Sequence, residues 1–213
     1  MVTTDVHEEI EIPGGSFNLP GELEIPQNAN ALVLFSHGSG SSRFSPRNQK
    51  VALTLRENGI GTFLFDLLDS GEDSIETRFD IHLLTKRLLF VTKWILRQSF
   101  TKGMNVGFFG ASTGAASALN AAAGRGDTIK AVVSRGGRPD LAMSALGHVK
   151  SATLLIVGEL DDQVLQLNEK AYDVLPPPKK LVIVPGATHL FEEPGKLEAV
   201  SDLASEWFKK FLS

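Results

Sequence analysis

Ser112 has the surroundings of a catalytic nucleophile. It lies between glycines two residues away on either side, in the pattern Gly110-x-Ser112-x-Gly114. An apolar run precedes this pattern and an alanine-rich run follows it, so we expect the serine in a tight turn between a strand and a helix. Glycine suits both flanking positions because a larger side chain there would collide with the neighbouring elements. The pattern therefore predicts a serine hydroxyl held above the edge of a sheet.

Asp161 and His189 supply the other two groups that an activated serine needs. Each follows an apolar run of strand character, and the carboxyl ends of parallel strands meet at one edge of a sheet. Because a serine hydroxyl is a poor nucleophile at neutral pH, we expect His189 to accept its proton and Asp161 to orient the imidazole and stabilise its positive form. Asp162 is the alternative acid, since a shift of one residue in the loop would exchange the two carboxylates.

A glycine-rich stretch after the first parallel strand, His37-Gly38-Ser39-Gly40, is a candidate oxyanion loop. The negative oxygen that develops on an acyl carbon needs two fixed hydrogen-bond donors. For these we expect the backbone N–H groups of Thr113 and Ser39, with Gly40 as the alternative to Ser39. The stretch is not typical of a nucleotide loop, because Arg43 stands where a third glycine belongs and no Gly-Lys-Ser/Thr follows. His37 is interpreted as a structural residue beneath the loop.

Four arginines follow strands on the same side as these groups. Arg43 and Arg47 come after the first parallel strand, and Arg135 and Arg138 come after the fourth. One hypothesis is a set of guanidinium groups that binds a carboxylate or phosphate of the substrate. The other is that the arginines brace the loops by pairing with aspartates, for which the candidates are Asp66, Asp69, Asp80 and Asp140.

The region around His189 does not predict a metal site. Glu192 and Glu193 follow the histidine, yet no second histidine lies at helical spacing. We interpret the two glutamates as favourable charges at the N-terminus of the last helix. The expected ligand is a small-molecule substrate, and no metal or cofactor is expected.

These residues need parallel strands to bring them together, and the rest of the chain fits such a sheet. From residue 31 onward, short apolar runs alternate with longer segments of helical period, which predicts a mostly parallel sheet covered by helices on both faces. Alternating residues around Pro13-Gly14-Gly15 predict a hairpin at the sheet edge. The eight expected strands are 7–12, 16–25, 31–36, 60–66, 104–110, 129–135, 152–157 and 180–185, and the expected helices are 46–58, 79–97, 112–124, 164–175 and 195–212.

Composition narrows the class of protein. The chain has 213 residues, with 21 basic and 25 acidic side chains, and its net charge of −4 does not suggest a nucleic-acid surface. The absence of cysteine excludes disulfide frameworks, cysteine zinc sites and a cysteine nucleophile. Residues 1–11 lack the basic and apolar segments of a secretory leader, and no apolar run approaches the about 20 residues of a membrane helix. We therefore expect a cytoplasmic protein with no membrane partner, folded as a single domain over residues 1–213, and leave its oligomeric state open.

The motifs resemble those of the α/β-hydrolase fold and, within it, the dienelactone-hydrolase-like group. The resemblance rests on the Gly110-x-Ser112-x-Gly114 turn, on the segment from Gly158 through Asp161 to Val164, and on His189 in a loop before the last helix. The order serine, aspartate, histidine is that of the α/β-hydrolase triad. The resemblance covers essentially the whole chain and implies a three-layer α/β/α sandwich. Dienelactone hydrolase proper uses a cysteine nucleophile, so for this chain the resemblance implies a serine esterase.

Residues and resemblance together predict a serine hydrolase that cleaves a small carboxylic ester, lactone or thioester through an acyl-enzyme, with an anionic substrate if the arginines bind one. Two alternatives stay open: an acyltransferase or peptidase that uses the same three residues, and a non-catalytic binding protein on the same fold. Only about sixteen residues separate Arg135 from Ala152, where many relatives insert a cap domain. We therefore expect no cap and an open site.

Overall fold

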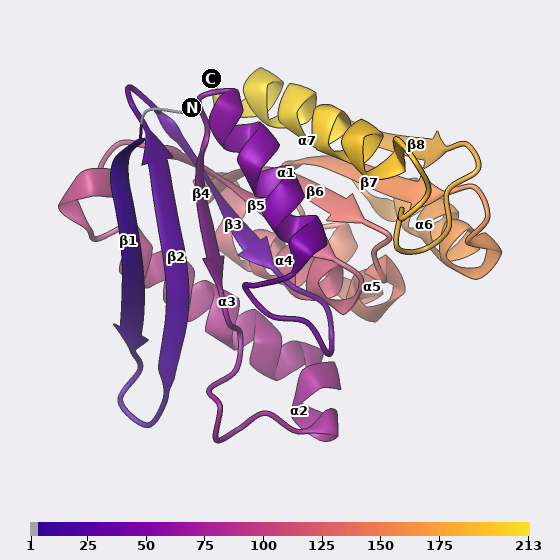
Figure 1. Cartoon of the computed structure of the whole chain (residues 1–213). Helices are drawn as coiled ribbons and strands as arrows, with labels where there is room; N and C mark the ends of the chain where they lie inside the picture. The colour runs from indigo at the N-terminus through magenta and orange to yellow at the C-terminus, as the bar shows by residue number, and fades with distance from the viewer. Residues whose placement is uncertain (1–3) are drawn as a thin grey trace.

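The computed structural model describes residues 4–213, and its centre is one sheet of eight strands in the order β1-β2-β4-β3-β5-β6-β7-β8 (Figure 1). Strands β3 to β8 run parallel, whereas β1 and β2 form an antiparallel hairpin that joins the sheet through β4. The strands are β1 Thr4–Pro13, β2 Asn18–Pro26, β3 Ala31–Ser36, β4 Gly61–Phe65, β5 Asn105–Ala111, β6 Ile129–Arg135, β7 Ala152–Gly158 and β8 Lys179–Val184. The mostly parallel sheet with an edge hairpin is confirmed.

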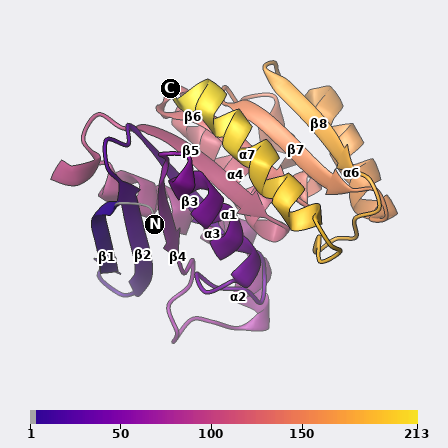
Figure 2. The ribbon, with the colours of Figure 1, turned by 45° about the horizontal axis from the view of Figure 1, so that its top comes forward.

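Helices cover both faces of this sheet, as the views in Figures 1 and 2 show. Apolar side chains of α1 and α7 pack with one face of the central strands, and those of α3, α4 and α6 pack with the other. The helices are α1 Pro46–Glu57, α2 Ile75–Phe79, α3 Ile81–Ile95, α4 Thr113–Arg125, α5 Met143–Leu146, α6 Asp162–Val174 and α7 Lys196–Leu212, with 3-10 turns at Ser99–Thr101, Gly126–Thr128 and Pro139–Ala142. The three-layer sandwich is confirmed.

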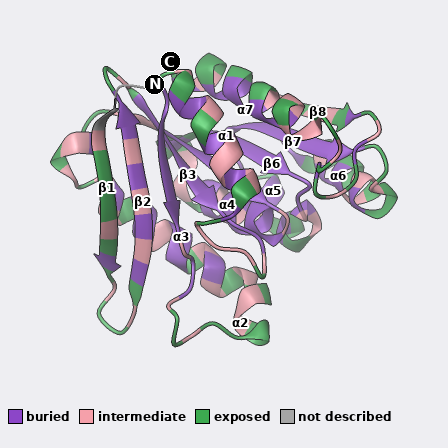
Figure 3. Cartoon of the chain, in the orientation of Figure 1, coloured by how far each residue is buried: buried purple, intermediate pink, exposed green. Residues whose placement is uncertain are grey.

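The central strands are buried along nearly their whole length because helices lie on both sides of them (Figure 3). Every residue of β3, β4 and β7 is buried, which matches the unbroken apolar runs in the sequence. By contrast, β8 at the edge of the sheet has one buried residue. Burial holds β3, β4 and β7 firmly in place, so that the loops at their carboxyl ends start from rigid positions.

The short elements were not predicted. Helices α2 and α5 have five and four residues, too few for a helical period to be visible in the sequence. In the connection from β6 to β7, the structure has a 3-10 turn and α5, so the predicted absence of a cap domain is confirmed for these residues.

Within residues 4–213, no helix is both long enough and apolar enough to span a bilayer. The single domain over residues 1–213, of which 1–3 lie outside the described residues, and the cytoplasmic location stay predictions.

Candidate active site

Ser112 occupies a sharp turn between β5 and α4. Its φ of 51° and ψ of −121° put a non-glycine residue in the left-handed region, which costs free energy and persists only where the surroundings impose it. A Cβ on Gly110 would lie 2.5 Å from Ala115 Cα, and one on Gly114 would lie 2.1 Å from the carbonyl oxygen of Ser36. Side chains at both positions are therefore impossible without moving backbone, the collision that the sequence pattern predicted.

Hydrogen bonds from the neighbouring strand hold this turn. Ser112 N–H donates to the carbonyl oxygen of Arg135 at 3.2 Å, and the carbonyl oxygen of Ser112 accepts from Ala115 N–H and Arg138 N–H, both at 3.1 Å. The nucleophile candidate is thus fixed by the same β6 end that carries two of the four arginines.

The loop after β8 brings His189 against Asp161, the residue just before α6. His189 Nδ1 lies 2.6 Å from Asp161 Oδ2, and because a carboxylate only accepts, Nδ1 is the donor and Nε2 keeps its lone pair when the ring is neutral. Gly136 has a φ of 50°, and a Cβ there would lie 3.1 Å from the carbonyl oxygen of His189 and 3.4 Å from its ring, so the turn after β6 leaves little space for a side chain next to the histidine. Asp162 is exposed in the first turn of α6 and makes no such contact; of the two candidates, the structure brings Asp161 to the histidine.

Ser112 and His189 line one cavity of about 240 Å³. Ser39, Arg47, Arg135 and Leu190 also line it. No hydrogen bond joins Ser112 Oγ to His189 within the described chain; such contacts are often long before a substrate binds. The three triad candidates therefore meet at one edge of the sheet, with the His–Asp contact formed.

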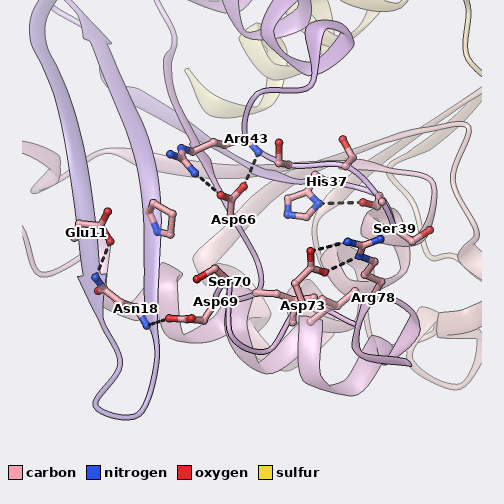
Figure 4. A pocket seen from close by; sticks show the side chains of 17 residues that line it. Glu11, Asn18, His37, Ser39, Arg43, Asp66, Asp69, Ser70, Asp73 and Arg78 are labelled. Carbon is pink, nitrogen blue, oxygen red and sulfur yellow. Dashed lines mark hydrogen bonds and ion pairs between the residues drawn. The ribbon is translucent and has the colours of Figure 1, made fainter. Parts of the chain in front are cut away.

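A second cavity of about 410 Å³ lies beyond the 37–43 loop, between that loop, the β1–β2 hairpin and the loop after β4 (Figure 4). His37 projects into its wall and is a structural residue there. Its Nε2 accepts the backbone N–H of Leu67 at 3.1 Å, and its Nδ1 donates to the carbonyl oxygen of Gly38 at 3.0 Å. Burial lowers the pKa of His37, so the neutral ring that these two bonds require is the favoured form.

The four arginines divide into two groups. Arg43 pairs with Asp66, and Arg138 makes a two-point contact with Asp140 at 2.8 Å for each bond. These two brace loops. The other two, Arg47 and Arg135, line the cavity of Ser112 and His189; Arg47 also pairs with Glu192 at 2.8 Å. The other predicted aspartates have different partners: Asp69 accepts backbone N–H groups and Asp80 caps α3.

Arg135 is a buried cation without a carboxylate. Its exposed fraction is 7%, its Nε has no partner, and among the side chains of residues 6–213 none makes an ion pair or hydrogen bond with it. Burial, and secondarily the charge of Arg47, lowers the pKa of Arg135 to about 10. The guanidinium is therefore charged at neutral pH and lacks a counter-ion inside an acidic protein.

The oxyanion candidates lie together, but one of the two N–H groups is engaged. Ser39 N–H donates to the hydroxyl of Thr113 at 2.8 Å. Thr113 is the first residue of α4, so its own N–H has no partner in the helix. The sequence predicts only the backbone N–H of Thr113 as a donor and gives no signal for its hydroxyl, because no sequence pattern states what a side chain at that position contacts.

One side-chain group outside this site has ligand atoms close together. One ligand atom each from His7, Glu22 and Glu24 lies within 4.8 Å of the others, on the face of the edge hairpin near α1. Arg56 Nη1 is 3.0 Å from Glu24, and Gln49 donates to Glu22 at 3.0 Å. A guanidinium thus already neutralises part of the charge that would attract a metal ion.

Known proteins resemble this chain along nearly its whole length. It is 52% identical to a dienelactone hydrolase from Anabaena variabilis ATCC 29413, with a TM-score of 0.94 and coverage of 98% of this chain and 99% of that one. Est1E from Butyrivibrio proteoclasticus is 18% identical, with a TM-score of 0.82 and coverage of 95% of this chain and 98% of that one; this likeness concerns the fold alone. The chain matches no protein-family model.

Two curated relatives come from Mycobacterium tuberculosis strains CDC 1551 / Oshkosh and H37Rv, and both are named as phosphoribosyl transferases. Each is 52% identical over 202 residues, which cover 94% of this chain and 46% of the relative. The chain therefore spans about half the length of the curated relatives it matches. The likeness to the Anabaena protein, in contrast, covers both chains almost completely. This chain belongs to the dienelactone-hydrolase-like family of α/β hydrolases.

Proposed function

We propose that this protein is a serine hydrolase that cleaves a small carboxylic ester, lactone or thioester through an acyl-enzyme. The observation that carries the proposal is the 2.6 Å contact of His189 with Asp161 beside a cavity that Ser112 and His189 share. A nucleophile, its base and the acid that orients the base are then available together. Membership of a hydrolase family supports this reaction, as does the shared fold of an esterase from Pyrococcus furiosus.

The reaction follows from the proton affinities of these groups. Ser112 Oγ attacks the carbonyl carbon while His189 Nε2 accepts its proton, and Asp161 stabilises the imidazolium through the Nδ1–H bond. The imidazolium then donates this proton to the leaving oxygen or sulfur, whose bond to the acyl carbon breaks. A water molecule then attacks the acyl-serine while His189 accepts its proton. The bond from the acyl carbon to Ser112 Oγ breaks, the imidazolium returns the proton to Oγ, and the acid is released. Because only short elements join β6 to β7 and the cavity measures about 240 Å³, the acyl group is small.

The charge of the cavity favours an anionic acyl group. Arg135 is a buried guanidinium without a partner, and the positive charge of Arg47 lies close enough to lower its pKa. Both line the cavity that contains Ser112. An uncompensated buried charge is costly, and a carboxylate or phosphate on the substrate would supply the missing counter-ion. We therefore propose Arg135 and Arg47 as the anion site, and leave Arg43 and Arg138 as loop braces.

Covalent labelling tests the serine mechanism. A fluorophosphonate probe reacts with an activated serine, so the wild type should be labelled and Ser112→Ala should not. Asp162→Ala is the matched control and should be labelled like the wild type. A wild type that stays unlabelled would support the non-catalytic alternative, and labelling that persists in Ser112→Ala would exclude Ser112 as the nucleophile.

Two esters of the same alcohol test the anion site. p-Nitrophenyl butyrate and p-nitrophenyl hemisuccinate both have four-carbon acyl groups, and only the second is charged. Loss of one charged hydrogen bond should lower kcat/KM for the hemisuccinate by about 10- to 100-fold in Arg135→Met, with little change for the butyrate. Arg138→Met should leave the ratio of the two unchanged. An equal loss for both esters in Arg135→Met would contradict an anion site.

The name of the Mycobacterium tuberculosis relatives concerns proteins about twice as long. We propose that phosphoribosyl transfer belongs to the part of those relatives that this chain does not match, because the residues here form a nucleophile–base–acid set. An assay of this chain with 5-phosphoribosyl diphosphate and the free nucleobases should give no nucleotide; nucleotide formation would contradict this assignment.

A further inference from the structure

The hydroxyl of Thr113 is the atom toward which Ser39 N–H points. The bond from Ser39 N–H to Thr113 Oγ1 is 2.8 Å long, and Thr113 is 3% exposed. It joins the 37–43 loop to the first residue of α4, directly after Ser112. Ser39 is the residue whose N–H was expected to stabilise the oxyanion, and that N–H is already engaged.

The hydrogen count at this contact leaves one donor unused. A threonine hydroxyl that accepts an N–H bond on oxygen still has its own hydrogen to donate. Among the residues that the structure describes, Thr113 Oγ1 has no hydrogen-bond partner other than Ser39 N–H. A buried hydroxyl hydrogen without an acceptor is unfavourable. Thr113 therefore carries two unused donors beside the nucleophile, its backbone N–H and its hydroxyl.

We propose that the Thr113 hydroxyl donates a hydrogen bond to the oxyanion, while its oxygen accepts the bond from Ser39 N–H. This inference rests on the proposed serine mechanism and assigns a residue to it. In the tetrahedral intermediate, the Thr113 N–H and O–H both donate to the negative oxygen, and Ser39 N–H keeps its bond to Oγ1. Acceptance of that bond polarises the hydroxyl and makes it a stronger donor. The catalytic role of Ser39 is then indirect.

The opposite arrangement predicts the opposite result. If the substrate oxygen displaces Thr113 Oγ1 and binds Ser39 N–H directly, the hydroxyl competes with the oxyanion. Removing it would then free Ser39 N–H and leave turnover unchanged or faster. Removing a donor that the intermediate uses lowers kcat by about 10²-fold or more. One substitution therefore separates the two arrangements by the sign of its effect.

The experiment compares Thr113→Val, which has nearly the shape of threonine without the hydroxyl, with Thr113→Ser, which keeps it. Thr113→Val should lower kcat for p-nitrophenyl butyrate by about 10²-fold with little change in KM, and Thr113→Ser should stay within a few fold of the wild type. Thr92→Val is the matched control, because Thr92 is a fully buried threonine of α3 outside the cavity. It should keep wild-type kcat.

Inhibitor binding distinguishes an oxyanion contact from a structural one. A trifluoromethyl ketone forms an oxyanion with Ser112, whereas the product butyrate does not. Thr113→Val should weaken the binding of the ketone by about the factor by which it lowers kcat, and it should leave inhibition by butyrate unchanged. Equal weakening of the binding of both inhibitors in Thr113→Val, or an undiminished kcat, would overturn this inference. If the wild type is still labelled by a fluorophosphonate, the proposed serine mechanism would stand. A wild type that is neither labelled nor active would remove the proposed function, and this inference with it.

Discussion

Replacing Arg135 by methionine should make the protein more stable and a poorer enzyme for anionic esters. In the native structure the pKa of Arg135 falls from its ordinary value to about 10, chiefly through burial. That fall corresponds to about 3 kcal/mol against the charged form. Methionine removes the charge and fills much of the same space, so we expect the free energy of unfolding to rise by about 2 kcal/mol. In a chain of this size, such a gain raises Tm by about 4–8 °C.

The pH range for this measurement follows from the lower pKa of Arg135 in the folded state. The native state binds the arginine proton more weakly than the unfolded state does, so the destabilisation is complete below pH 10 and diminishes as pH rises above about 10. A comparison at pH 7 therefore measures the whole effect, and the difference between wild type and Arg135→Met should be constant from pH 6 to 8.

Urea unfolding and thermal unfolding at pH 7 measure the difference, with Arg138→Met as the control. Arg138 is already paired with Asp140, so its replacement should lower stability by less than about 1 kcal/mol. Succinate, the acid released from the hemisuccinate ester, should raise the Tm of the wild type and not that of Arg135→Met. An Arg135→Met protein no more stable than the wild type would refute the argument that Arg135 is an uncompensated charge.

Three other results are expected. Asp161→Asn should lower kcat by about 10⁴-fold in an ester assay, whereas Asp162→Asn, which leaves the His189 contact intact, should not. Because burial lowers the pKa of His37, its neutral ring contributes fully to the stability of the protein above pH 6.5, and this contribution is lost as pH falls below that value. The Tm of the wild type should therefore drop from pH 7 to 5. An equally steep drop in His37→Gln would contradict this. Gly114→Ala, whose Cβ would meet a β3 carbonyl oxygen at 2.1 Å, should destabilise by at least about 3 kcal/mol in urea unfolding, whereas Gly124→Ala, with open space around it, should stabilise by about 1 kcal/mol.

The parts of the site that depend on backbone position could be predicted from the sequence. Ser112, Asp161 and His189 all follow strands of the parallel sheet, and parallel strands put their carboxyl ends at one edge of the sheet. The glycines at 110 and 114 were predictable for the same reason, since contacts with β3 and with α4 leave no room for a side chain. Their placement requires only the order of strands and the length of the turns.

The parts that depend on side-chain partners could not be predicted. Arg135 and Arg138 are three residues apart at the end of one strand, yet one is buried without a carboxylate and the other pairs with Asp140. Which of them finds a counter-ion depends on the turn at Pro139–Ala142, and the apolar pattern says nothing about it. The bond from Ser39 N–H to the Thr113 hydroxyl likewise joins side chain and backbone across 74 residues of sequence.

The ion pair of Arg47 with Glu192 has a consequence for how a substrate would enter. The side chain of Glu192 is 63% exposed and that of Arg47 is 30% exposed, and an ion pair in such contact with water contributes little free energy. Arg47 can therefore exchange Glu192 for an incoming anion at small cost, while Arg135 has no partner to give up. Because Glu192 lies three residues after His189, the exchange would release the histidine loop from α1 at the moment when an anionic group arrives. The proposed anion site would then be coupled to the mobility of His189, and the two arginines would differ in role. Arg135 would attract the anion, and Arg47 would link its binding to the position of the histidine loop.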